Sequence, residues 1–141
     1  MQFVDTNVLL YAACRTSRDA AKRRRALELL AEPDLALSVQ VLQEFYHQAT
    51  RRSREGRLTP EQALTFLEPL RLFPIQELTP ALFDLAVAIS QRFRLSYWDG
   101  AILAAAKVLG CEVVYSEDLS DDQDYDGLRA VNPFRIQTKA Q

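Results

Sequence analysis

Residues 111–118 read CEVVYSED, a short apolar and β-branched run that ends in two acids. Gly110 precedes the run and an acidic segment follows it, which is typical of a buried β-strand bounded by turns. The start of the chain repeats the pattern, because residues 2–5, QFVD, form another apolar run that ends in an acid. An ionised carboxylate beside a buried segment is costly unless a helix cap, an ion pair or a metal compensates it. Both strands therefore lead into acidic groups that need an explanation.

Further strands and helices alternate along the chain. Strands are predicted at residues 2–5, 35–37, 74–77, 111–116 and 128–131. Helices are predicted at residues 7–13, 18–31, 39–54, 60–72, 80–92 and 97–109, several of them after a capping Ser or Thr. This order predicts an α/β fold whose mostly parallel sheet is covered by helices on both faces.

Composition excludes several classes of protein. The chain has 141 residues, of which 48% are hydrophobic and 26% charged, with a net charge of -2, as expected for one globular domain spanning residues 1–141. No apolar run approaches the length of a membrane span, and the N-terminus lacks the pattern of a signal peptide. Cys14 and Cys111 stand far apart, outside any C-x-x-C motif. We expect a cytoplasmic protein with reduced cysteines and no membrane segment.

The acids after the two strands are expected to meet. In a parallel sheet the carboxyl ends of the strands lie at one edge, and ligands bind there. Asp5 would lie at this edge, together with Glu117 or Asp118 from the later strand. Taken alone, Asp5 is equally well explained as the N-cap of the following helix. Position favours Glu117 or Asp118 over the acids further along, without deciding between the two.

Two other acids lie on predicted helices. Ser96 and Asp99 match a capping box, but Asp99 also flanks an apolar stripe and lies at the positive end of a helix, which suits a metal ligand as well as a cap. That stripe comprises Trp98, Ile102, Ala105 and Leu109. Glu44 lies roughly opposite the stripe of its own helix, which comprises Val39, Leu42, Phe45, Tyr46 and Ala49. Periodicity alone therefore predicts that Glu44 faces solvent.

The remaining side chains offer little other chemistry. His47 is the only histidine, so a histidine-rich zinc site is excluded, and neither a nucleophile elbow nor a glycine-rich phosphate loop occurs. Several carboxylates without histidine or thiol form an all-oxygen site, which prefers Mg²⁺ or Mn²⁺. Phosphodiester hydrolysis is the usual reaction there. Possible phosphate contacts are Arg51, Arg52, Arg54 and Arg92, for each of which a solvated surface role is at least as good an explanation.

Four segments, taken in order, resemble the PIN domain family. They are FVDTNVLLYA at residues 3–12, SVQVLQEFYHQATR at 38–51, LSYWDGAILAAAKVLGC at 95–111 and VVYSEDL at 113–119. Each motif alone is weak, whereas four in order, each with its acid, are specific. The chain most resembles the VapC group, the ribonuclease toxins of prokaryotic toxin–antitoxin pairs.

This resemblance implies a three-layer α/β/α sandwich with a short, mostly parallel sheet and a metal-dependent endoribonuclease site. By position in the motifs, the catalytic and metal-binding acids would be Asp5, Glu44, Asp99 and Asp118, with Mg²⁺ or Mn²⁺ as cofactor. The family places supporting polar residues where this sequence has Thr6 or Asn7 and Ser116. Periodicity predicts that Glu44 faces solvent, whereas the resemblance implies that it belongs to the site, and we follow the resemblance. RNA would be the substrate, a small antitoxin protein the partner, and a homodimer the assembly.

Two alternatives stay open. A PIN-like module that has lost catalysis would bind RNA or a protein without cutting. A plain structural domain would use its acids only as helix caps. Replacing Asp5 and Asp99 by Asn distinguishes these readings, since only an enzyme would lose cleavage and keep RNA binding.

Overall fold

The computed structural model describes residues 1–135. Its elements follow one another as β1 (Gln2–Val4), α1 (Thr6–Ala13), α2 (Ala20–Leu30), β2 (Leu35–Ser38), α3 (Val39–Thr50), α4 (Pro60–Leu67), β3 (Ile75–Gln76), α5 (Pro80–Phe93), α6 (Tyr97–Val108), β4 (Val113–Tyr115), β5 (Asp124–Tyr125) and β6 (Leu128–Val131). Short 3₁₀ turns at Ser17–Asp19 and Pro69–Leu72 precede α2 and follow α4. Within residues 1–135, no helix has the length and apolarity needed to cross a bilayer.

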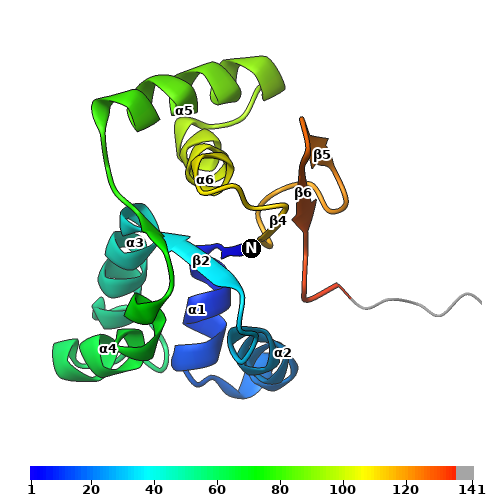
Figure 1. The fold of residues 1–141 in the computed structure, drawn as a ribbon. Coiled ribbons are helices and arrows are strands. Elements are labelled where there is room, and N and C mark those ends of the chain that lie inside the picture. Colours follow the sequence, from blue (N-terminus) through cyan, green and yellow to red (C-terminus); the bar gives the residue numbers. More distant parts are fainter. Residues whose placement is uncertain (136–141) are drawn as a thin grey trace, which may run out of the picture.

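The strands form one sheet in the order β3-β2-β1-β4-β6-β5. All neighbours are parallel except β5, which runs antiparallel to β6. Figure 1 shows α5 and α6 on one side of the sheet and the layer of α1 to α4 on the other. The α/β/α sandwich with a short, mostly parallel sheet is therefore confirmed. Because β1 pairs with both β2 and β4, the ends of these three strands meet at one edge.

The sheet is buried on both faces, as its apolar strands require. Phe3, Ala36 and Val114, on β1, β2 and β4, are fully buried. Helix α6 is buried along its whole middle, from Gly100 to Ala106. A helix that is apolar all round belongs in an interior, and α6 fills this role between α5 and the sheet. Its N-terminal turn is consequently fixed beside the edge where β1 and β4 end.

Gly100 permits the close approach of α5 and α6. A Cβ atom at this position would lie 2.7 Å from the Ala86 carbonyl oxygen and 2.9 Å from Ser90 Cβ, both on α5. We expect Gly100→Ala to destabilise the fold by about 1–3 kcal/mol through overpacking, despite the higher helix propensity of Ala. Thermal unfolding measures the effect, with Val108→Ala on the exposed face of α6 as control. A variant as stable as the wild type would show that the two helices separate without cost.

The largest departures from the predicted elements lie in α3, in α4 and in the acidic segment before β6. Helix α3 ends at Thr50 rather than 54, and the Arg54 side chain folds back so that its Nε donates to the Gln48 carbonyl oxygen at 2.8 Å. Helix α4 ends at Leu67 rather than 72, because Pro69 has no N–H to continue the helix. Strand β5 lies in the acidic segment expected to be a loop.

Candidate active site

Asp5 ends β1 and begins α1, and its carboxylate is held by protein donors on both oxygens. The Thr6 backbone N–H donates to Asp5 Oδ1 at 2.7 Å, and the Ser116 hydroxyl donates to Asp5 Oδ2 at 2.7 Å. The residue is only 4% exposed. Asp5 therefore caps α1, and it also lies at the sheet edge where β4 ends.

Burial makes the ionised form of Asp5 costly. The pKa of its carboxyl rises from the ordinary 3.8 to about 7, chiefly because burial removes it from water. The hydrogen bonds from Ser116 and Thr6 oppose this rise, whereas the charges of Asp118 and Glu44 add to it. A cation bound beside Asp5 would stabilise the charged form of its carboxyl.

Glu44 lies off the buried face of α3, as periodicity predicts, but it is half-buried and bonded to α1 rather than free in solvent. The Thr6 hydroxyl donates to Glu44 Oε2 at 2.8 Å, and the Gln40 amide donates to Glu44 Oε1 at 2.9 Å. The buried face of α3 consists of Gln40, Val41, Phe45 and Ala49. A polar residue, Gln40, belongs to this face, and Glu44 lies one turn further along its edge.

Asp99 lies in the first turn of α6, after the cap Ser96, whose hydroxyl oxygen accepts from the Asp99 N–H at 3.1 Å. The pKa of the Asp99 carboxyl is raised, first by burial and then by the charges of Asp118 and Glu44. The neighbouring Trp98 was wrongly placed in the apolar stripe of this helix. It is 63% exposed and lines a surface cavity instead.

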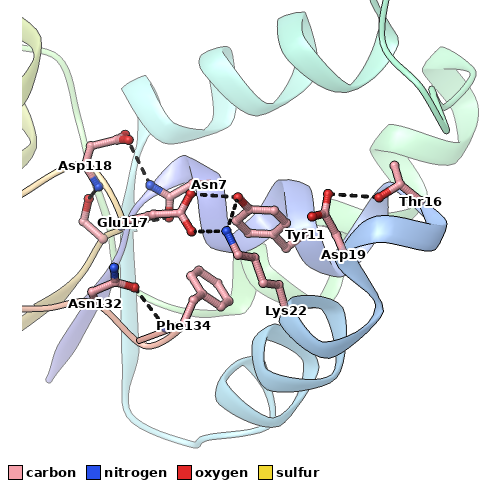
Figure 2. Close-up of polar contacts among 10 residues, drawn as sticks. Asn7, Tyr11, Thr16, Asp19, Lys22, Glu117, Asp118, Asn132 and Phe134 are labelled. Carbon is pink, nitrogen blue, oxygen red and sulfur yellow. Dashed lines mark hydrogen bonds and ion pairs between the residues drawn. The ribbon is translucent and has the colours of Figure 1, made fainter. Parts of the chain in front are cut away.

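Glu117 and Asp118 turn to different sides after β4 (Figure 2). Asp118 is exposed, its Oδ2 accepts from the Asn7 amide at 3.2 Å, and its N–H donates to the Ser116 hydroxyl at 3.1 Å. Glu117 accepts from Tyr11 and Lys22 on the other side. Between the two acids that the sequence left open, Asp118 faces the other acids.

Two of the acids, Asp118 and Glu44, lie close enough to Asp5 and to Asp99 for their charges to raise the pKa of both. Beside them is a cavity of about 540 Å³. Glu44 and Asp118 line this cavity, while Asp5 and Asp99 are not among its lining residues. The other lining residues are Thr6, Asn7, Leu10, Gln40, Gln43, His47, Gln48 and Trp98. Of the expected supporting residues, Thr6 hydrogen-bonds Asp5 and Glu44, Ser116 hydrogen-bonds Asp5 and Asp118, and Asn7 hydrogen-bonds Asp118.

Several residues of this region were not predicted. Gln40 could have been suspected from its spacing, since it stands one helical turn before Glu44 and their side chains meet. Gln43, Gln48 and Trp98 line the cavity without any signal of their own in the sequence. Tyr11 and Lys22 contact Glu117 across the fold, a contact that no local pattern predicts.

The four arginines considered as phosphate contacts differ in their surroundings. Arg54 bonds to Gln48 and so lies near the cavity rim. Arg51 and Arg52 are exposed just after α3. Arg92 makes a two-pronged ion pair with Asp126, its Nε and Nη2 atoms lying 2.7 Å and 2.9 Å from the two carboxylate oxygens. Binding a phosphate through Arg92 would require this pair to open.

The donor set fits a hard divalent cation by its chemistry. Carboxylate and neutral oxygens are the ligands that such ions prefer, and the charges of Asp118 and Glu44 beside Asp5 and Asp99 favour a bound positive charge. As the side chains lie, no three acidic, histidine or cysteine groups within residues 1–135 are already arranged as a metal site. The carboxylates of Asp5 and Glu44 are instead engaged by Thr6, Ser116 and Gln40.

The comparison with known protein families matches the part of the chain that contains the four motifs. A sequence model of the PIN domain matches residues 3–121. The chain belongs to the PIN domain family. No curated protein sequence matches the chain. All four acids of this PIN domain fall within the matched span.

Solved structures share the fold of this PIN domain. A toxin–antitoxin complex from Klebsiella pneumoniae is 23% identical with a TM-score of 0.70, covering 96% of this chain and 100% of that one. VapC20 from Mycobacterium tuberculosis, described as a toxin that cleaves the sarcin–ricin loop, is 22% identical with a TM-score of 0.63, covering 84% of this chain and 90% of that one. VapBC2 from Rickettsia felis, bound to promoter DNA, is 18% identical with a TM-score of 0.60, covering 92% and 96%.

Proposed function

We propose that this PIN domain is a metal-dependent endoribonuclease that hydrolyses phosphodiester bonds of RNA, and that it is the toxin of a toxin–antitoxin pair. The observation that supports the proposal is that Thr6 links Asp5 to Glu44, and Ser116 links Asp5 to Asp118, through hydrogen bonds, while the charges of Asp118 and Glu44 raise the pKa of Asp99. Membership of the PIN family supports the reaction class. The fold shared with toxins of such pairs supports the biological role.

The four acids would hold Mg²⁺ or Mn²⁺ directly or through water. When bound there, the ion supplies a positive charge that polarises the scissile phosphate and acidifies a water molecule. The protein's own groups orient the ligands. Thr6 and Gln40 fix the two oxygens of Glu44, and Ser116 fixes one oxygen of Asp5. These contacts hold the carboxylates in place before a cation arrives, which reduces the cost of ordering them.

RNA would approach over the cavity rim. We assign phosphate contacts to Arg51, Arg52 and Arg54, which lie at and after the end of α3, and less directly to Arg92, which has to leave Asp126. A long positively charged side chain from an antitoxin would fit the same acidic cavity, and charge complementarity is the reason to propose such a partner. A homodimer and a cytoplasmic location belong to the same proposal.

Metal removal tests the proposed reaction. The purified protein is expected to cut single-stranded or looped RNA with Mg²⁺ or Mn²⁺, to stop in excess EDTA, and to recover when Mn²⁺ is restored, because the acids alone cannot neutralise the phosphate. Gel analysis of end-labelled RNA measures cleavage, and fluorescence anisotropy measures binding. Cleavage that persists in EDTA would contradict the proposal. RNA binding without cleavage in either metal would favour the alternative, a PIN domain that binds but does not cut.

A further inference from the structure

Glu117 takes part in a closed set of contacts with Tyr11 and Lys22, here called the Lys22 triangle (Figure 2). The Tyr11 hydroxyl donates to Glu117 Oε1 at 2.7 Å. Lys22 Nζ donates to Glu117 Oε2 at 2.8 Å and to the Tyr11 hydroxyl oxygen at 3.1 Å. The three residues come from α1, α2 and the segment after β4, so the triangle ties together three elements distant in sequence.

Aromatic rings partly shield the Lys22 triangle. Lys22 Nζ lies 4.8 Å from the Tyr11 ring centroid and 5.9 Å from that of Phe134, and these two rings meet edge to face at 4.8 Å. The Lys22 and Glu117 side chains are 38% and 29% exposed. Charge-assisted hydrogen bonds with less solvent around them are stronger than exposed ion pairs. The triangle is therefore a firmer anchor than the pair of Arg129 and Asp122, whose side chains are 59% and 74% exposed.

The anchor acts on the residues that carry the acid of the candidate site. The Glu117 N–H donates to Asn7 Oδ1 at 3.4 Å, and the Asn7 amide donates to Asp118 Oδ2 at 3.2 Å. Ser116 bonds to Asp5 at the same time. Three consecutive side chains thus have three different surroundings. Ser116 bonds to Asp5, Glu117 belongs to the Lys22 triangle and Asp118 lines the cavity.

We propose that Lys22 and Tyr11 are positioning residues that hold Glu117 away from the acidic cluster and thereby present Asp118 to it. The inference rests on the proposed function, in which Asp118 helps to hold the cation. Without Lys22, Glu117 loses its counter-charge and its fixed direction. Two adjacent carboxylates then compete for one place, and the segment of residues 116–118 becomes mobile.

Amide hydrogen exchange tests the positioning in pure protein, without metal or RNA. Lys22→Met is expected to speed exchange at the Glu117 and Asp118 amides by about tenfold or more, because local opening becomes easier. Lys22→Arg keeps the charge and the donors and should stay near the wild type. Arg129→Met is the matched control, since it removes one cation and one ion pair from the same acidic segment on its exposed side. Tyr11→Phe provides a second disruptive variant if Lys22→Met does not fold.

Two further readouts separate positioning from a merely structural contact. Lys22→Met should weaken Mn²⁺ binding, followed by the electron paramagnetic resonance of free Mn²⁺, and should lower kcat by about tenfold with KM for RNA little changed. Lys22→Arg should restore most of both losses. Glu117→Gln combined with Lys22→Met should lose no more than Lys22→Met alone, because the two residues act through one contact.

Each outcome decides the inference. Unchanged amide exchange in Lys22→Met overturns it. Faster exchange with unchanged Mn²⁺ binding and kcat also overturns it, since Lys22 would then only stabilise the fold. A rise in KM alone, matched by Arg129→Met, would make Lys22 a general attractor of RNA. If the wild-type protein neither binds Mn²⁺ nor cuts RNA, the proposed function fails, while amide exchange still decides whether Lys22 orders residues 116–118.

Discussion

Replacing Asp5 or Asp99 by Asn is expected to lower the rate of RNA cleavage by about 10²–10³-fold, the loss seen when a charge-stabilising group leaves an active site. Asn preserves the size and much of the hydrogen bonding of Asp, including acceptance from the Thr6 N–H at position 5. It removes the negative charge that would hold the cation. RNA binding should persist, because the arginines proposed to contact phosphate lie at other positions. Single-turnover cleavage and anisotropy measure the two effects separately.

Asp84→Asn is the matched control, since Asp84 is exposed on α5, a helix that carries none of the four acids. It should leave cleavage unchanged. If the variants at positions 5 and 99 cut RNA normally and lose only about 1 kcal/mol of stability, these acids are helix caps and nothing more.

The same substitution at Asp5 is expected to stabilise the metal-free protein at neutral and alkaline pH. The pKa of Asp5 rises from 3.8 to about 7 on folding, so the folded state holds a proton more tightly than the unfolded state between these values. Wild-type stability therefore falls by on the order of 4 kcal/mol as pH increases from about 4 to 7. Above pH 7 the titration of Asp5 changes the stability no further. Asn has no such titration, so Asp5→Asn should gain most over the wild type at pH 8 and little at pH 4.

A divalent cation should reverse this difference. Saturating Mg²⁺ or Mn²⁺ is expected to raise the Tm of the wild type at pH 8, because the ion binds the folded state alone. The rise should shrink towards pH 5, where Asp5 is protonated, and should be small in Asp5→Asn. Scanning fluorimetry across pH 4 to 8, with and without metal, measures all of these shifts. A wild-type melting curve unmoved by either ion would leave the raised pKa without a functional explanation.

The fold was predictable because local signals determine most of it. Ser38, Thr59, Thr79 and Ser96 each cap a helix as expected, and each accepts a backbone N–H through its side-chain oxygen. The apolar runs before Asp5 and Ser116 became adjacent parallel strands. These features depend on few neighbouring residues, so one sequence suffices to find them.

Side-chain directions were harder to predict because they depend on distant partners. Glu44 faces the cavity since α1 packs beside α3 and offers Thr6, which no helical wheel of α3 contains. Trp98 is exposed although α6 is buried from Gly100 to Ala106. Glu117 and Asp118 are chemically alike and adjacent, and only contacts from α1 and α2 separate their roles.

The central place of β1 in the sheet has a consequence for biosynthesis. Asp5 and its hydrogen-bond partner Ser116 are separated by 111 positions in the sequence, so Asp5 is synthesised long before Ser116. Contacts of such long separation form slowly and late, since a long stretch of polypeptide must first be ordered. On a nascent chain the four carboxylates therefore remain dispersed until synthesis has passed β4 and that strand has docked beside β1. Any product that stops before Asp118 lacks one of the four acids.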